Sequence, residues 1–314
     1  MTWSRLSMEN FTVNEDEHHL FNKFEPFLCV GRPTEKTLQI RFLSASNFFL
    51  SFTAALGNIL ILVALSKISS LHPSSKILYR CLATTDLCVG MVAQPLFAVQ
   101  LLFRVDERRF LCYIALRMCY CSGVILCGVS MTTLTAISVD RLLALQLALR
   151  YRQVVTSRRV RGLVIFFWIA SVFVSTTYFW NDFIALTASC SAPLLCLLTS
   201  GLSYARMYVS LRQHHVQIGV QNRTTVLNIT RYRRTVSSAL FIQIGLVICY
   251  LPYGVVSAKL ITSGLKSALI FPFAISYCLL LFNSSLNPLL YCWKMRNVRQ
   301  AVKNTIRQFL HCFL

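Results

Sequence analysis

The chain has 314 residues, of which 55% are hydrophobic and only 13% are charged, and its mean hydropathy is +0.58. This composition excludes an ordinary soluble domain, because such domains carry about twice this share of charged residues. A net charge of +20 suits a nucleic-acid-binding protein, but the basic residues lie in alternate segments of the chain, so we expect no nucleic-acid partner.

The first segment, residues 1–41, is polar and partly acidic, and we predict that it forms an extracellular tail. It lacks the apolar core of about 7–15 residues that a cleavable signal peptide needs. Asn10 begins the sequon Asn-Phe-Thr and is the expected glycosylation site.

Seven stretches without Asp, Glu, Lys or Arg follow in chain order. A helix needs about 20 apolar residues to cross the hydrocarbon core of a membrane. Only helices or closed barrels satisfy their backbone groups in lipid, and the short alternating segments of a barrel are not seen. We therefore predict an all-α bundle of seven transmembrane helices over residues 42–292. The expected helices are 42–66, 77–103, 112–141, 162–180, 184–211, 233–260 and 268–292.

The connections between these helices alternate in charge. Most of the 31 Lys and Arg residues lie in every second connection and in the C-terminal segment, together with a single acid, Asp140. Because an excess of Lys and Arg marks the cytoplasmic side, we predict a multi-pass plasma-membrane protein with its N-terminus outside.

The final segment, residues 293–314, is predicted to be a basic amphipathic helix that lies in the cytoplasmic interface and is attracted to anionic lipid. Cys312 is either a palmitoylation site or an unmodified thiol. The apolar positions recur at steps of three and four residues: Met295, Val298, Val302, Ile306 and Phe309.

Polar motifs stand inside or at the ends of several predicted helices. Asp140-Arg141 closes the third, Cys249-Tyr250-Leu251-Pro252 lies in the sixth, and Asn287-Pro288-Leu289-Leu290-Tyr291 closes the seventh. With these motifs in this order, residues 44–310 resemble the rhodopsin-like (class A) G-protein-coupled receptors. The resemblance implies a receptor that transmits the binding of an extracellular ligand to a heterotrimeric G protein through outward movement of helix 6.

The resemblance also implies a set of switch and coupling residues. Arg141 is expected to pair with Asp140 at rest and to meet the G protein in the active state. The alternatives are an arginine that snorkels to water and proline kinks that are static. No acid stands at the inner end of helix 6, so an ionic lock to Arg141 is absent and appreciable basal activity is expected. The set comprises Asp140, Arg141, Tyr204, Tyr250, Pro252, Asn287, Pro288 and Tyr291.

One acid, Asp86, lies deep inside a predicted span, where a bare carboxylate is costly. By resemblance, it binds an allosteric sodium ion together with Ser130, Asn283 and Ser284, and oxygen ligands suit such a hard cation. The other interpretation is a protonated carboxyl group in a hydrogen-bond network without an ion. No other cofactor is expected.

The outer half of the bundle is expected to hold the ligand. Gly123 matches the aspartate of amine receptors and Leu281 matches the retinal lysine of opsins, so the resemblance argues against an amine and excludes a retinal Schiff base. Arg117 and Lys259 either anchor an anionic ligand or snorkel to lipid headgroups. The candidate pocket residues are Arg117, Tyr120, Gly123, Tyr250 and Lys259.

The usual extracellular disulfide of the family is missing, because the loop around Asn181-Asp182 is very short and has no cysteine. A bridge between Cys29 and Cys112 and a pair of free thiols both remain open. We place the chain in the melanocortin, adenosine and lipid-receptor neighbourhood of the family.

Arrestins recognise several phosphorylated sites. The tail after Tyr291 has one hydroxyl residue, Thr305, so any arrestin contact is expected at the third inner loop. Two rival functions stay open: a transporter or channel, although no internal repeat is seen, and a receptor-like scaffold that does not signal. An enzyme is not expected, because no nucleophile–base pair stands out.

Overall fold

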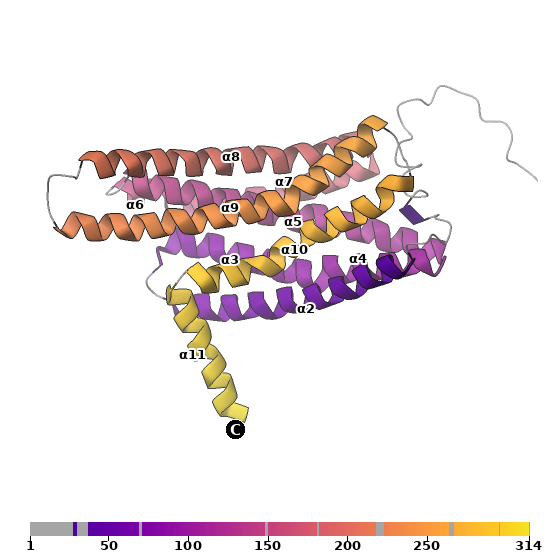
Figure 1. The fold of residues 1–314 in the computed structure, drawn as a ribbon, viewed down its shortest axis with the longest axis horizontal. Coiled ribbons are helices and arrows are strands. Elements are labelled where there is room, and N and C mark those ends of the chain that lie inside the picture. Colours follow the sequence, from indigo (N-terminus) through magenta and orange to yellow (C-terminus); the bar gives the residue numbers. More distant parts are fainter. Residues whose placement is uncertain are drawn as a thin grey trace, which may run out of the picture.

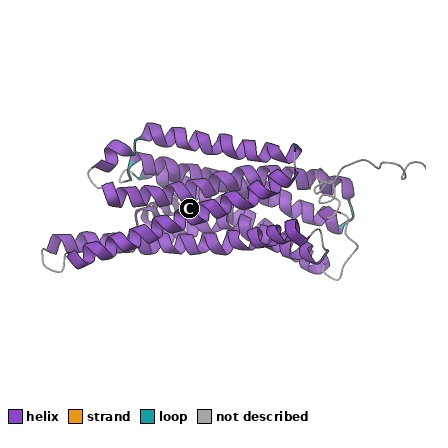
Figure 2. Ribbon diagram, turned by 90° about the horizontal axis from the view of Figure 1, so that it is seen from above, coloured by secondary structure: helices purple, strands orange, loops and turns teal. Residues whose placement is uncertain are grey.

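The computed structural model describes residues 28–29, 37–68, 71–147, 150–180, 182–217, 223–263, 267–294 and 296–313. Every regular element in these ranges is a helix (Figure 2). The long helices lie side by side along the longest axis of the molecule, and the last one points away from the bundle (Figure 1). The α-helices are α2 (Thr37–Lys67), α3 (Pro73–Cys88), α4 (Gln94–Val105), α5 (Arg109–Leu147), α6 (Tyr151–Val154), α7 (Ser157–Thr176), α8 (Asp182–Gln217), α9 (Arg223–Ser263), α10 (Ile270–Lys294) and α11 (Arg296–Phe313). Short π or 3₁₀ segments lie at Val89–Ala93, Thr177–Phe179 and Ser267–Leu269.

Seven helices in the described part of the chain are long and apolar enough to cross a membrane, namely α2, α3 with α4, α5, α7, α8, α9 and α10. The predicted all-α seven-helix bundle is therefore confirmed. We call the end of the bundle that carries Asp140 the inner end, and the end that carries Cys112 the outer end.

Several helices are longer than predicted. The helix α2 begins at Thr37, so the predicted tail of residues 1–41 loses its last residues to the first span. The helices α8 and α9 also extend beyond the expected 184–211 and 233–260. The prediction was wrong there because a charge-free run marks the part of a helix in lipid, and Lys and Arg continue a helix into the interface.

The second span contains a π-helical segment, Val89–Ala93, that was not predicted from the sequence. At Gly90 an added Cβ would lie 2.9 Å from the Cβ of Ala54, so only glycine allows α2 to approach this closely. Ser51 Oγ donates a hydrogen bond of 2.6 Å to the Gly90 carbonyl, which satisfies an acceptor at the irregular turn.

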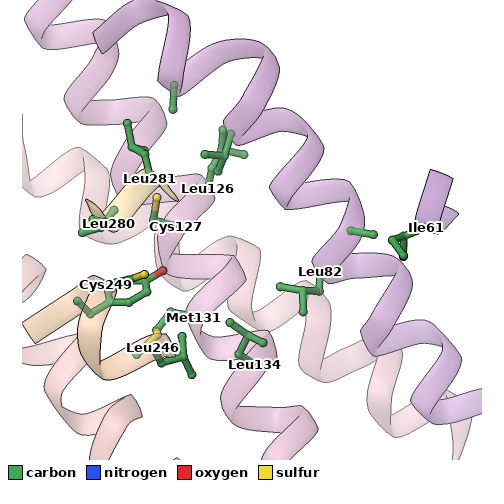
Figure 3. Close-up of a cluster of buried hydrophobic side chains, with 14 of the residues drawn as sticks. Ile61, Leu82, Leu126, Cys127, Met131, Leu134, Leu246, Cys249, Leu280 and Leu281 are labelled. Carbon is green, nitrogen blue, oxygen red and sulfur yellow. The ribbon is translucent and has the colours of Figure 1, made fainter. Parts of the chain in front are cut away.

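The central helix of the bundle is α5, which contacts α3, α4, α7 and α8. Figure 3 shows Cys127 and Met131 of α5 in the same apolar cluster as Leu246 and Cys249 of α9. The cluster therefore includes buried side chains from both α5 and α9.

The last helix, α11, docks on the inner end of α2. Lys67 Nζ donates hydrogen bonds to Thr305 Oγ1 (3.2 Å) and to Gln308 Oε1 (2.7 Å). Val298 and Val302 are buried, as expected for the inward face of an amphipathic helix. The side chain of Cys312 lies outside the described residues.

Candidate functional site

A buried carboxylate joins three helices in the middle of the bundle. Asp86 of α3 is fully buried. Its Oδ1 accepts hydrogen bonds from Ser130 Oγ of α5 and Ser284 Oγ of α10, both at 2.9 Å. Its Oδ2 accepts one from Asn287 Nδ2 of α10 at 2.7 Å. The structure thus brings together most of the polar residues that the sequence predicts, and these three donors point at one acid.

Asn58 of α2 completes this cluster. Its Nδ2 donates to the carbonyls of Ala54 (2.8 Å) and Ser284 (3.1 Å), whereas its Oδ1 is buried without a partner among the described residues. The Nδ2 of Asn283 is also buried and has no hydrogen-bond partner among the described residues. One carboxylate, two hydroxyl groups and a spare amide oxygen are a donor set that fits a hard monovalent cation.

The helix α2 reaches this cluster because of Gly57. A Cβ at Gly57 would lie 2.9 Å from the Cγ of Pro288 in α10. The Gly57-Asn58 pair therefore seats the proline of α10 against α2 and places the Asn58 amide beside the cluster.

A second polar cluster lies at the inner end, around Asp140. The carboxylate is buried and accepts hydrogen bonds from Ser75 Oγ of α3 (2.8 Å) and from Tyr151 Oη of α6 (2.6 Å). Burial and the bond to Asp140 raise the pKa of Tyr151 to about 12. Tyr151 therefore keeps its proton at physiological pH and acts as the donor.

Arg141 has a looser attachment. Its Nη2 lies 3.7 Å from Asp140 Oδ2, and its Nε and Nη2 have no hydrogen-bond partner in the described structure. The guanidinium instead lies over the ring of Tyr79, with Cζ 5.6 Å from the centroid. Tyr79 in turn meets Tyr291 edge-on at 5.4 Å. The expected contact of Arg141 with Asp140 is present but long, and a cation–π contact accompanies it.

Tyr204 of α8 is buried beside α5, where its hydroxyl oxygen accepts a hydrogen bond of 2.7 Å from Ser138. Above it, Gln243 of α9 bonds to Ser200 Oγ (2.7 Å) and to the Leu197 carbonyl (3.2 Å), both of α8. These contacts hold α8 to α5 and α9 to α8 in the inner half of the bundle.

In the outer half, Tyr277 of α10 occupies the space beside Gly123. A Cβ on Gly123 would lie 2.1 Å from Tyr277 Oη. That hydroxyl donates to the carbonyl of Cys119 (3.2 Å), so a tyrosine from α10 fills the position that the resemblance assigns to an aspartate in amine receptors.

Two cavities lie in this outer half. One of about 40 Å³ lies near the outer end and includes Tyr120. The other, of about 220 Å³, is lined by Gly123 and Tyr250, among others. Arg117 and Lys259 are exposed and line neither cavity. Which face a helix turns inward depends on its rotation, which the sequence does not fix.

The outer end carries a disulfide between Cys29 and Cys112, with the Cα atoms 5.8 Å apart. The sequence left open either this bridge or a pair of free thiols, and the structure has the bridge. Leu28 beside it is 4% exposed and packs with Leu260 and Ile270. The bridge therefore anchors an N-terminal segment across the outer end of the bundle.

Comparison with known proteins agrees with this architecture. A family model described as "7 transmembrane receptor (rhodopsin family)" matches residues 57–181. The chain is 25% identical to adenosine receptor A2b of Bos taurus over 307 residues, which cover 85% of this chain and 90% of that protein. The chain is similar to the rhodopsin-like receptors. Seven spans make it a multi-pass protein of the plasma membrane.

Two further relatives of this receptor match over shorter lengths. Adenosine receptor A2b of Rattus norvegicus is 31% identical over 152 residues, which cover 48% of this chain and 44% of that protein. The Mus musculus protein of the same name is 31% identical over 150 residues, which cover 47% and 43%. These alignments span less than half of the rat and mouse proteins. The adenosine receptors fit the neighbourhood expected from the sequence.

Sequence reasoning about this receptor misses Ser75, Tyr79, Tyr151 and Tyr277. Spacing gives no signal for the first three, because their roles depend on how α3 and α6 approach Asp140 and Arg141. Tyr277 has a usable signal, since a phenol inside a span needs a hydrogen-bond partner. Asn10 lies outside the described residues, as do the side chains at the inner end of α9.

Proposed function

We propose that this receptor transmits ligand binding to a heterotrimeric G protein through outward movement of the inner end of α9. The observation that carries the proposal is the Asp86 cluster, because one buried carboxylate ties α3, α5 and α10 together. A ligand that prefers one packing of these helices shifts a two-state equilibrium. A transporter, a silent scaffold and an enzyme have no comparable support.

The helix α9 has the features such a movement needs. Pro252 lies inside it and removes one backbone hydrogen bond, which allows a bend. Below the proline, Gln243 bonds to α8 in place of an ionic lock. Two neutral hydrogen bonds contribute about 1–3 kcal/mol, so the resting packing is held weakly and basal activity is expected.

The proposed inner face for the G protein contains Arg141. The cation–π contact with Tyr79 and the long contact with Asp140 leave two of its nitrogens without a hydrogen-bond partner among the described residues, and both are buried in this packing. Outward movement of α9 is proposed to expose them to a carbonyl of the G protein. Arrestin is proposed to use the third inner loop, because the single hydroxyl of the tail, Thr305, is 1% exposed and already bonded to Lys67.

A sodium ion is proposed as an allosteric ligand of Asp86, Ser130, Ser284 and the Asn58 amide oxygen. It would supply the positive charge that a buried carboxylate otherwise lacks. The extracellular ligand is proposed to be neither an amine nor a Schiff-base chromophore, because Tyr277 fills the space beside Gly123 and position 281 is a buried leucine. The relatives are named adenosine receptors, so adenosine is the first candidate to test.

Nucleotide exchange on each G-protein family, with the receptor in membranes, tests the proposal. We expect basal or adenosine-stimulated exchange that Arg141→Ala abolishes and that Arg108→Ala, at an exposed outer-end arginine, leaves intact. No exchange with any G protein, basal or stimulated, would favour the scaffold. Glycosylation at Asn10 tests the proposed orientation with the N-terminus outside.

A further inference from the structure

A gap opens to the membrane between α7 and α8. The helix α7 packs on α5 but scarcely touches α8. The cavity of about 220 Å³ lies there, and its rim includes the exposed Phe166 of α7 and the exposed Ala192 of α8. Its floor includes Met131 and Tyr250, which are 2% and 4% exposed. The cavity therefore runs from the lipid-facing surface into the centre of the bundle.

A second cavity of about 360 Å³ continues the first towards the inner end. The two share Thr132, Phe167 and Cys196 in their walls. The second is also lined by Leu143 and Leu163, nearer the inner end. Together they form a slot along the gap between α7 and α8, of the size of small-molecule sites, which are about 300–1,000 Å³. We call this the α7–α8 slot.

The outer cavity of the slot favours an uncharged occupant, whereas Asp140 lines the inner cavity. Among the described residues, no Asp, Glu, Lys or Arg lines its outer cavity, so a charged group there would be costly. The Thr132 hydroxyl bonds to carbonyls of its own helix, and Tyr277 bonds to Cys119. Tyr250 is 4% exposed and borders the cavity, and no hydrogen bond of its hydroxyl is found among the described residues. One ligand oxygen would satisfy it.

The cavity near the outer end is much smaller than the one that opens between α7 and α8. The disulfide of Cys29 with Cys112 holds Leu28 over the outer end of the bundle, and the cavity beneath it measures only about 40 Å³. The rim at Phe166 and Ala192 lies within membrane spans, where the surrounding solvent is hydrocarbon. A molecule that reaches Tyr250 by the wider path comes from the bilayer.

We propose that the α7–α8 slot binds an uncharged lipid with a single hydroxyl group, such as a sterol or a long-chain alcohol. Its apolar body lies between α7 and α8, and its oxygen bonds to Tyr250. Tyr250 stands two residues before Pro252 in α9, so the bound lipid touches the helix whose movement couples to the G protein, a consequence that rests on the proposed function.

The experiment measures lipid binding rather than signalling. The full-length receptor is purified and labelled with a photoreactive cholesterol or a photoreactive long-chain alcohol, with unlabelled lipid as competitor, and the labelled peptides are mapped. We expect competed labelling on α7 and α8. Tyr250→Phe should weaken apparent affinity about 2- to 10-fold, the worth of one hydrogen bond. Tyr208→Phe, at an exposed tyrosine of α8, should not.

A second variant blocks the mouth of the slot. Ala192→Trp should abolish the competed labelling, whereas the same change at the exposed Ala258 of α9 should leave it intact. Preference for one probe would tell a sterol from a long-chain alcohol, and both results support the slot. Labelling that cannot be competed, or that survives both Ala192→Trp and Tyr250→Phe in folded protein, overturns the proposal.

The two proposals fail separately. Arg141→Ala should lose nucleotide exchange but keep labelling, because Arg141 itself lines neither cavity of the slot. Competed labelling without any exchange would therefore remove the signalling function and leave the lipid site. Nucleotide exchange without competed labelling would remove the lipid site and leave the signalling function.

Discussion

Replacing Gly123 with alanine would place a Cβ 2.1 Å from the hydroxyl oxygen of Tyr277 and 3.3 Å from its Cζ. Tyr277 cannot easily turn away. It is 9% exposed, its ring meets Phe97 edge-on at 4.8 Å, and Phe273 stacks against it at 6.3 Å. The tyrosine must shift as a unit, and it would break its bond to the Cys119 carbonyl.

Two effects are expected to lower the free energy of unfolding, and a third is expected to raise it. Overpacking a tight core costs about 1–3 kcal/mol. Losing the hydrogen bond of Tyr277 adds about 0.5–1.5 kcal/mol. Alanine in place of glycine stabilises a helix interior by about 1 kcal/mol. We therefore expect Gly123→Ala to lower the free energy of unfolding by about 1–3 kcal/mol, which corresponds to a fall in Tm of about 2–10 °C.

Thermal unfolding of the purified receptor measures this change. The matched control is Gly162→Ala on α7, where an added Cβ meets nothing within 4 Å and Tm should hold or rise. The double variant Gly123→Ala with Tyr277→Phe should recover most of the loss, because the nearest remaining ring atom is 3.3 Å away. A Gly123→Ala receptor as stable as the parent, or no recovery in the double variant, would refute the packing described here.

Three other predictions concern the polar clusters and the bridge. Sodium chloride should raise Tm relative to choline chloride at equal ionic strength. At a sodium concentration ten times its Kd, binding should add about 1.4 kcal/mol to the free energy of unfolding. Asp86→Asn should abolish that difference, and a variant that still responds to sodium would argue for the ion-free network. Gln243→Leu should raise basal nucleotide exchange about 2- to 10-fold, since it removes both bonds from α9 to α8; unchanged exchange would contradict that role. Cys29→Ser and Cys112→Ser should each lower stability by up to about 4 kcal/mol, because the bridge closes a loop with a sequence separation of 83. The double variant should lose no more than either single one, and additive losses would count against the bridge.

The sequence predicts the seven spans and the main polar cluster because both leave local signals. A charge-free run has to be about 20 residues long to cross lipid, and that length can be counted. An acid inside such a run, like Asp86, needs polar partners, and Ser130, Ser284 and Asn287 are among the polar residues in neighbouring spans.

Other features depend on how helices approach one another, and the sequence holds no local record of that. Tyr151 lies 11 residues from Asp140, yet their bond exists only because α6 folds back on α5. Arg117 and Lys259 stand near the outer ends as predicted, but the rotation of α5 and α9 turns both outward. Helix ends were wrong for a different reason, since charge stops a span without stopping a helix.

The departures from the family pattern compensate for one another in space. Gly123 removes a side chain from α5, and Tyr277 of α10 fills the space. At the position of Tyr250 in α9 the rhodopsin-like receptors usually carry a tryptophan, and a phenol is smaller than an indole and carries a hydroxyl. The cavity of about 220 Å³ lies beside Tyr250, whose hydroxyl has no hydrogen bond among the described residues. A ligand with an apolar body and one hydroxyl group would both fill this space and bond to Tyr250, so the two features together favour the proposed lipid.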